Sequence, residues 1–213
     1  RLVAALQDVV VCLAEAGAGV RGVWEYPTGG FVSGSPAAAA DGTLRVHSND
    51  GRLHGLSPDG QPLWPPVDVG ESLNWSSPLV DSEGTTWLCG YSGGIIKVDA
   101  SGKKSPRPYF RSPNKFDCTG VLHGGMLVVG SEDQFVHAID LRGDRGSEVW
   151  DQRANHGRTN WFINSAIALA SGPTFVVASR DEHLYGFAPD GSDVWQTKVP
   201  GQVLGSPVVD ADD

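Results

Sequence analysis

The side chains best suited to binding chemistry gather in one connecting segment, residues 151–164. The segment carries two guanidinium groups, an imidazole, an amide and an indole, which belong to Arg153, Arg158, His156, Asn160 and Trp161. Guanidinium groups pair with carboxylate or phosphate, and an indole face covers a sugar ring or an aromatic anchor. The segment therefore predicts a binding site for an acidic or polyhydroxy partner.

Two other connecting segments extend this candidate site. Residues 65–75 end in Asn74 and Trp75, the same dipeptide as Asn160 and Trp161, and residues 111–117 add four polar side chains, Arg111, Asn114, Lys115 and Asp117. Connections that exceed the minimum of a repeat are where function tends to reside. The alternative is that both tryptophans fold back as packing lids and that the charges are merely solvated.

Catalytic and metal-binding patterns are lacking. No G-x-S-x-G or phosphate-loop motif occurs, and Asp117 is the one acid at a strand start, whereas glycoside hydrolysis needs two opposed carboxylates. His54 and His137 recur at one repeat position, which favours a structural role. Three cysteines, Cys12, Cys89 and Cys118, match no metal or redox spacing and are expected to be small core residues. These patterns favour a binding protein over an enzyme, with no metal site.

Composition narrows the partners. The formal net charge of −9 argues against nucleic acid, which requires a basic footprint. No apolar run approaches the ~20 residues of a membrane-spanning helix. The 28 glycines and 14 prolines are typical of short strands joined by turns.

The chain repeats itself about every 42 residues. The clearest copies are residues 48–64 and 179–195, `SNDGRLHGLSPDGQPLW` and `SRDEHLYGFAPDGSDVW`. Each copy predicts four short strands separated by polar turns, the fourth carrying Trp24, Trp64, Trp150 or Trp195, with Phe110 as the substitute in one copy. Four antiparallel strands per repeat form a blade, so the sequence predicts an all-β propeller.

The spacing of the repeats predicts how the propeller closes. One apolar third-strand position recurs as Val10, Leu53, Ile95, Val136 and Leu184, and wrapping from the last residue to the first gives a similar step. We therefore expect a single domain over 1–213, a ring of five blades closed by strand exchange, in which residues 1–23 and 196–213 form one blade. The alternative is that the chain is a fragment of a seven- or eight-bladed ring. In that case it is part of a larger protein and not a monomeric ring.

The blade sequence resembles the pyrroloquinoline-quinone-like, or tryptophan-docking, β-propeller repeat. The pattern is carried by Ser76, Ser77 and Pro78, by Gly130 and Ser131, by residues 137–140 (`HAID`), and by Trp150. The resemblance implies that the tryptophans dock between blades and that the protein lies outside the cytoplasm, in a periplasmic or secreted location.

The resemblance also raises the question of quinone chemistry. Members that bind pyrroloquinoline quinone hold it under a disulfide of adjacent cysteines, beside a calcium ion bound by Glu, Asn and Asp. This chain has no adjacent cysteines. Asp117 is its one acidic residue at a strand start, and Glu71 lies a few residues before another strand start. We therefore expect neither pyrroloquinoline quinone nor calcium in this protein. The sequence favours a non-catalytic scaffold that binds a protein segment or a small polar, anionic or sugar-like ligand. The alternative is a quinoprotein-type dehydrogenase domain.

Overall fold

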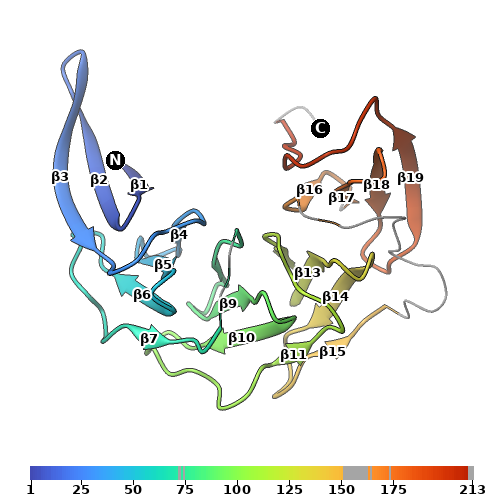
Figure 1. Cartoon of the computed structure of the whole chain (residues 1–213), viewed down its shortest axis with the longest axis horizontal. Coiled ribbons are helices and arrows are strands. Elements are labelled where there is room, and N and C mark those ends of the chain that lie inside the picture. Colours follow the sequence, from blue (N-terminus) through green and yellow to red (C-terminus); the bar gives the residue numbers. More distant parts are fainter. Residues whose placement is uncertain (72, 74, 151–162, 164, 173, 211–213) are drawn as a thin grey trace. The chain divides into compact units, whose positions relative to one another are not determined.

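The computed structural model describes residues 1–71, 73, 75–150, 163, 165–172 and 174–210. Within them every helix-or-strand element is a β-strand, and the strands form five antiparallel sheets, four of four strands and one of three (Figure 1). The prediction of an all-β chain of short hairpin strands is confirmed. No helix in the described residues is long and apolar enough to cross a membrane.

The first unit comprises Arg1–Leu88 and Ile96–Arg107. Its first sheet has three strands, β1 (Leu2–Leu6), β2 (Val9–Ala16) and β3 (Gly19–Pro27). Its second sheet has four, β4 (Ala37–Ala38), β5 (Leu44–Ser48), β6 (Arg52–Leu56) and β7 (Val67–Asp68). The third sheet, with strands in both units, contains β8 (Leu79–Val80), β9 (Thr86–Cys89), β10 (Gly94–Val98) and β11 (Phe110–Arg111).

The second unit comprises Cys89–Ile95 and Pro108–Asp213. Its first complete sheet contains β12 (Val121–His123), β13 (Met126–Gly130), β14 (Val136–Asp140) and β15 (Ser147–Glu148). Its second contains β16 (Ala168–Ala170), β17 (Thr174–Ser179), β18 (His183–Phe187) and β19 (Asp193–Lys198).

The inner strands of these sheets are buried on both faces. On β13, three consecutive side chains, Leu127, Val128 and Val129, are all fully buried. Such a strand reads as a continuous apolar run because each of its faces packs against other side chains. The repeat position predicted from the sequence lies on equivalent inner strands. Val10, Leu53, Ile95 and Val136 each have no exposed surface, whereas Leu184 on β18 is half-buried.

The tryptophans dock as the repeat predicts. Trp24 donates from Nε1 to the carbonyl oxygen of Pro58 at 3.0 Å, and Trp150 donates in the same way to Pro189 at 2.9 Å. Each acceptor lies in the turn that follows the third strand of the next repeat. The indole therefore joins successive repeats by packing and by one hydrogen bond.

In the copy without a tryptophan, Tyr109 takes this role and not Phe110. The hydroxyl of Tyr109 donates to the carbonyl oxygen of Gly143 at 2.8 Å, and its side chain is 4% exposed. Phe110 lies one residue later on β11 and is only half-buried. The expectation of Phe110 was wrong by one residue, because the side chains of adjacent strand residues point to opposite faces.

Closure of the ring stays a prediction. In the described residues β1 pairs with β2 alone, so the first sheet has three strands. Residues 199–210 form no strand. The blade expected from residues 1–23 and 196–213 is thus described only in its first part, by β1–β3.

Candidate functional site

Much of the binding site expected from sequence lies outside the described residues. This holds for Arg153, His156, Arg158, Asn160 and Trp161, and for Asn74. The described members are Trp75, Arg111, Lys115 and Asp117.

Trp75 is presented to solvent. Its side chain is 64% exposed, so it does not act as a packing lid in this structure. Arg111, at the end of β11, is also exposed, and its Nη1 donates to the carbonyl oxygen of Ser92 at 3.2 Å. Both side chains are therefore available to a partner.

Lys115 is instead engaged within the protein. Its Nζ donates to the hydroxyl of Tyr91 at 2.6 Å, lies 3.2 Å from a carboxylate oxygen of Glu132, and sits 4.2 Å from the centre of the Tyr91 ring. The hydrogen bond to Tyr91, followed by that to Glu132, raises the pKa of Lys115 despite partial burial. Lys115 orders Tyr91 and is not a free cation, while Asp117 is half-buried and has partners of its own.

Two exposed aromatic residues that the sequence reading did not select lie at the same edge of their sheets as Trp75 and Arg111. Phe31 is 50% exposed in the connection from β3 to β4, and Tyr91 is 39% exposed in the turn from β9 to β10. In the first unit, the backbone N–H of Ser35 donates to the hydroxyl of Ser77 at 2.9 Å, which holds the connection of Phe31 beside that of Trp75. We call Phe31 and Trp75, whose connections lie side by side in the first unit, the loop edge.

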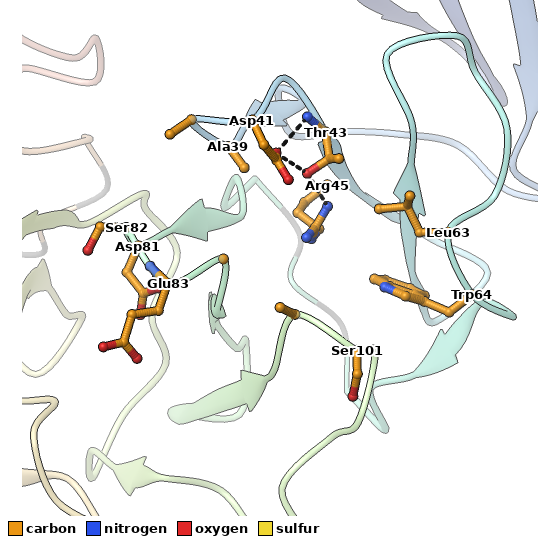
Figure 2. A pocket seen from close by; sticks show the side chains of 13 residues that line it. Ala39, Asp41, Thr43, Arg45, Leu63, Trp64, Asp81, Ser82, Glu83 and Ser101 are labelled. Atoms are coloured by element: carbon orange, nitrogen blue, oxygen red, sulfur yellow. Dashed lines mark hydrogen bonds between the residues drawn. The ribbon is translucent and has the colours of Figure 1, made fainter.

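A pocket of about 620 Å³ opens at the other edge of the sheets of the first unit, where β4 turns into β5 and β8 turns into β9 (Figure 2). Arg45 and Trp64 lie on one side of it, and Asp81, Ser82 and Glu83 lie on the other. The volume falls within the range of small-molecule sites, about 300–1,000 Å³.

Arg45, on β5, is the most unusual residue of this pocket. Its side chain is 2% exposed, and no carboxylate of the described residues lies within ion-pair distance of it. Three hydrogen bonds orient the guanidinium. Its Nε donates to the hydroxyl of Thr86 at 3.2 Å, and its Nη1 donates to the hydroxyl of Thr43 and to the carbonyl oxygen of Leu44, both at 3.1 Å. Burial lowers the pKa of Arg45, partly offset by the charge of Asp41. Arg45 is thus a desolvated cation held by neutral groups.

Trp64 covers this guanidinium. The centre of its ring lies 5.8 Å from Cζ of Arg45, a cation–π distance. The ring is held between Gly55 of β6 and Gly102, where added Cβ atoms would lie 2.3 and 2.7 Å away. Unlike Trp24 and Trp150, however, Trp64 has a buried Nε1 that finds no hydrogen-bond partner among the described residues.

The acidic residues of the pocket differ in their freedom. Both oxygens of Asp81 are occupied, Oδ1 by the backbone N–H groups of Glu83 and Thr85 and Oδ2 by the indole of Trp87. The hydrogen bond from the Thr43 hydroxyl is the main cause that lowers the pKa of Asp41. Glu83 is exposed and its carboxylate makes no hydrogen bond to another described residue, so it is available to a ligand.

The sequence reading missed this pocket, although a signal was present. When the copies are aligned on Val46, Cys89, Val129 and Val177, Arg45 stands where three others have Leu88, Val128 and Val176. A charge at a repeat position that is otherwise apolar was the available signal. The connecting segments depart from the repeat more visibly, because they differ in length as well as in residue type.

The residues present do not fit the quinone site that the repeat family implies. The three cysteines are buried and form no disulfide with one another, and burial raises the pKa of the Cys118 thiol, whose Sγ donates to the Gly130 carbonyl. In the described part of the chain, no group of three or more His, Cys, Asp or Glu side chains is arranged to hold a metal ion.

Comparison with known proteins supports the repeat and the fold. Residues 133–213 match the family model described as outer membrane protein assembly factor BamB, a pyrroloquinoline-quinone-like repeat family, which confirms the predicted resemblance there. A curated protein of that name from Salmonella typhimurium is 32% identical over 90 residues, and the match covers 36% of this chain and 23% of that protein.

The crystal structure of BamB from Moraxella catarrhalis matches with a TM-score of 0.72 at 16% identity. The match covers 96% of this chain and 59% of that one, so the chain spans less than two thirds of either relative. At this identity the likeness establishes the fold alone, and the predicted β-propeller is confirmed.

Proposed function

We propose that this chain is a non-catalytic β-propeller scaffold that binds a segment of a partner protein through the loop edge. The observation that carries the proposal is the exposure of large aromatic side chains on connections at one edge of the sheets, above all Trp75 with 64% of its surface in solvent. Aromatic and Arg residues are the commonest hot spots of protein interfaces. An indole that is costly to leave in water is best explained by a partner that covers it.

The neighbours of Trp75 suit such a partner. Phe31 adds a second apolar surface in the same unit, beside the polar groups of Ser35 and Ser77. An apolar centre with polar groups around it is the usual anatomy of a protein interface. Arg153, Arg158 and Trp161, which lie outside the described residues, belong to an equivalent connection in the sequence and are proposed as a further binding segment.

The names of the relatives indicate which class of partner protein to propose. Both carry the name BamB, and the curated protein is called an outer membrane protein assembly factor. We therefore propose that the partner is a protein of outer-membrane assembly and that this chain works outside the cytoplasm. The specific partner is left to experiment.

Site-specific photo-crosslinking tests the proposal. A benzophenone amino acid replaces Trp75 or Phe31 in turn, and replaces Val20 as a control, because Val20 is also 64% exposed but lies on the regular strand β3. Crosslinks in envelope extracts are identified by mass spectrometry. We expect one defined protein to crosslink at positions 75 and 31 and not at position 20.

The affinity of the identified protein is then measured. The double substitution Trp75→Ala with Phe31→Ala should weaken binding at least about 30-fold, as expected for a hot spot of 2 kcal/mol, whereas Val20→Ala should leave it unchanged. Equal crosslinking at all three positions, or unchanged affinity of a double variant with a native circular dichroism spectrum, would show that the loop edge is not the interface.

A further inference from the structure

The pocket around Arg45 is independent of the loop edge, since it lies at the opposite edge of the sheets. Its central feature is a guanidinium that is 2% exposed and has no carboxylate within ion-pair distance among the described residues. A buried charge without a directly paired carboxylate is unfavourable, and a well-packed apolar residue in its place often gives a protein of equal or greater stability. Other copies of the repeat do have Leu88, Val128 and Val176 there. The stability of the blade therefore does not explain Arg45.

The indole N–H of Trp64, next to this guanidinium, is a second donor, and it makes no hydrogen bond to another described residue. Equivalent indole N–H groups donate to carbonyl oxygens, that of Trp24 to Pro58 and that of Trp150 to Pro189. The Nε1 of Trp64 is buried and has no hydrogen-bond partner in the part of the chain that the structure describes. Buried polar groups are nearly always hydrogen-bonded, so an exception beside a cavity points to a ligand atom that accepts from it.

The remaining walls indicate the charge of the ligand. Asp41 lies near Arg45, and Glu83 stands on the far side of the pocket with an available carboxylate (Figure 2). A doubly charged anion such as phosphate would be repelled by these acids. A group with one negative charge, joined to a cationic group some distance away, would complement both walls.

We propose that this pocket binds the carboxylate of a short peptide. The carboxylate accepts hydrogen bonds from the Arg45 guanidinium and from Nε1 of Trp64, and an ammonium group of the peptide faces Glu83. The volume of about 620 Å³ accommodates a few residues. A free peptide and the C-terminal tail of a partner protein present the same chemistry.

Calorimetry with defined peptides tests this assignment on the whole chain. The probes are the tripeptide Lys-Ala-Ala as the free acid, its C-terminal amide, and a small carrier protein that ends in the same three residues. We expect the free acid to bind and the amide to bind at least 10-fold more weakly. Binding of both acid forms identifies a site for any such carboxylate; binding of the carrier alone identifies a site for protein tails. The same affinity for acid and amide, or no binding of either acid form at millimolar concentration, would overturn the proposal.

Variants assign the binding to the two donors. Arg45→Leu installs the apolar residue of the other copies; it should remain folded, melt at the same or a higher temperature, and lose at least 10-fold in affinity for the acid. Trp64→Phe keeps the ring but removes the N–H, and should weaken the acid several-fold. Glu83→Gln should weaken Lys-Ala-Ala while leaving its fully acetylated form unaffected.

Controls separate this proposal from folding and from the loop edge. If Arg45→Leu fails to fold, Arg45→Lys keeps the charge but loses the planar fork and serves in its place. Trp75→Ala should bind the tripeptide as the unaltered chain does. Undiminished binding by a folded Arg45 variant would reject the site even if partner binding at the loop edge is confirmed.

Discussion

The indole of Trp150 lies against Gly191 so closely that a Cβ atom on this glycine would come within 2.6 Å of the ring. Trp24 stands in the same relation to Gly60, with the same separation. Both glycines have positive φ, at 83° and 79°, so the turn requires glycine for its backbone and for its lack of a side chain. The docking of each tryptophan depends on this pairing across successive repeats.

Gly191→Ala should therefore cost more than backbone strain alone. Gly172 is a matched control because its φ is also positive, at 70°, but nothing lies within 4 Å of a Cβ there. We expect Gly172→Ala to lower the free energy of unfolding by about 1 kcal/mol and Gly191→Ala by a further 1–3 kcal/mol from overpacking against the indole. Urea denaturation of both variants measures the difference, and equal losses would show that the indole does not set the requirement.

Trp195 tests the closure that the repeat spacing predicts. It packs on Gly186 of its own sheet but is 39% exposed, whereas Trp150 is 3% exposed. If the ring closes through its termini, Trp195 would meet Gly17, which occupies the place of Gly60 and Gly191 in the repeat. Trp195→Ala should then cost about 3–5 kcal/mol, as expected for Trp150→Ala. A loss below about 1 kcal/mol, measured in the same denaturation experiment, would contradict closure.

His47 should make the protein sensitive to mild acid. Burial, only partly offset by the nearby Asp50, lowers the pKa of His47 from 6.5 to about 4. The unfolded chain takes up a proton at this residue below about pH 6.5, whereas the folded chain does so only near pH 4. Stability therefore falls as the pH falls through this window, by about 3 kcal/mol at most. His47→Leu should flatten this part of the pH profile, and an unchanged slope would argue against a neutral, buried His47.

His137 should act in the opposite direction. Burial by itself would lower its pKa, but hydrogen bonds to Asp133 at 3.0 Å and Glu148 at 2.7 Å outweigh burial, and the pKa is raised. The protonated imidazole therefore stabilises the fold below the unfolded pKa of about 6.5, and this contribution is lost as the pH rises through the higher folded pKa.

The variant His137→Gln isolates this contribution. The difference in unfolding free energy between the unaltered chain and the variant should be largest below pH 6 and should shrink toward pH 9. NMR titration of the His137 ring provides an independent measurement. A difference that grows with pH would mean that the neutral imidazole is the stabilising form.

Sequence periodicity determined the blades of this protein. The apolar position shared by Val10, Leu53 and Val136 fell on inner strands, and Trp24 and Trp150 docked on the next repeat. These features were predictable because strands and turns depend on residues close together in the chain, and because the same residue pattern occurs in each copy of the repeat.

Tertiary structure alone decided how individual side chains are used. Lys115 pairs with Tyr91 and Glu132 instead of remaining free, and Arg45 is held by Thr86, 41 residues away. Whether a cation is exposed, paired or buried under an indole depends on which distant segments meet around it and how much water they exclude. Local spacing does not contain that information. The connecting segments could therefore be predicted from the sequence, whereas the walls of the Arg45 pocket depend on how the sheets pack.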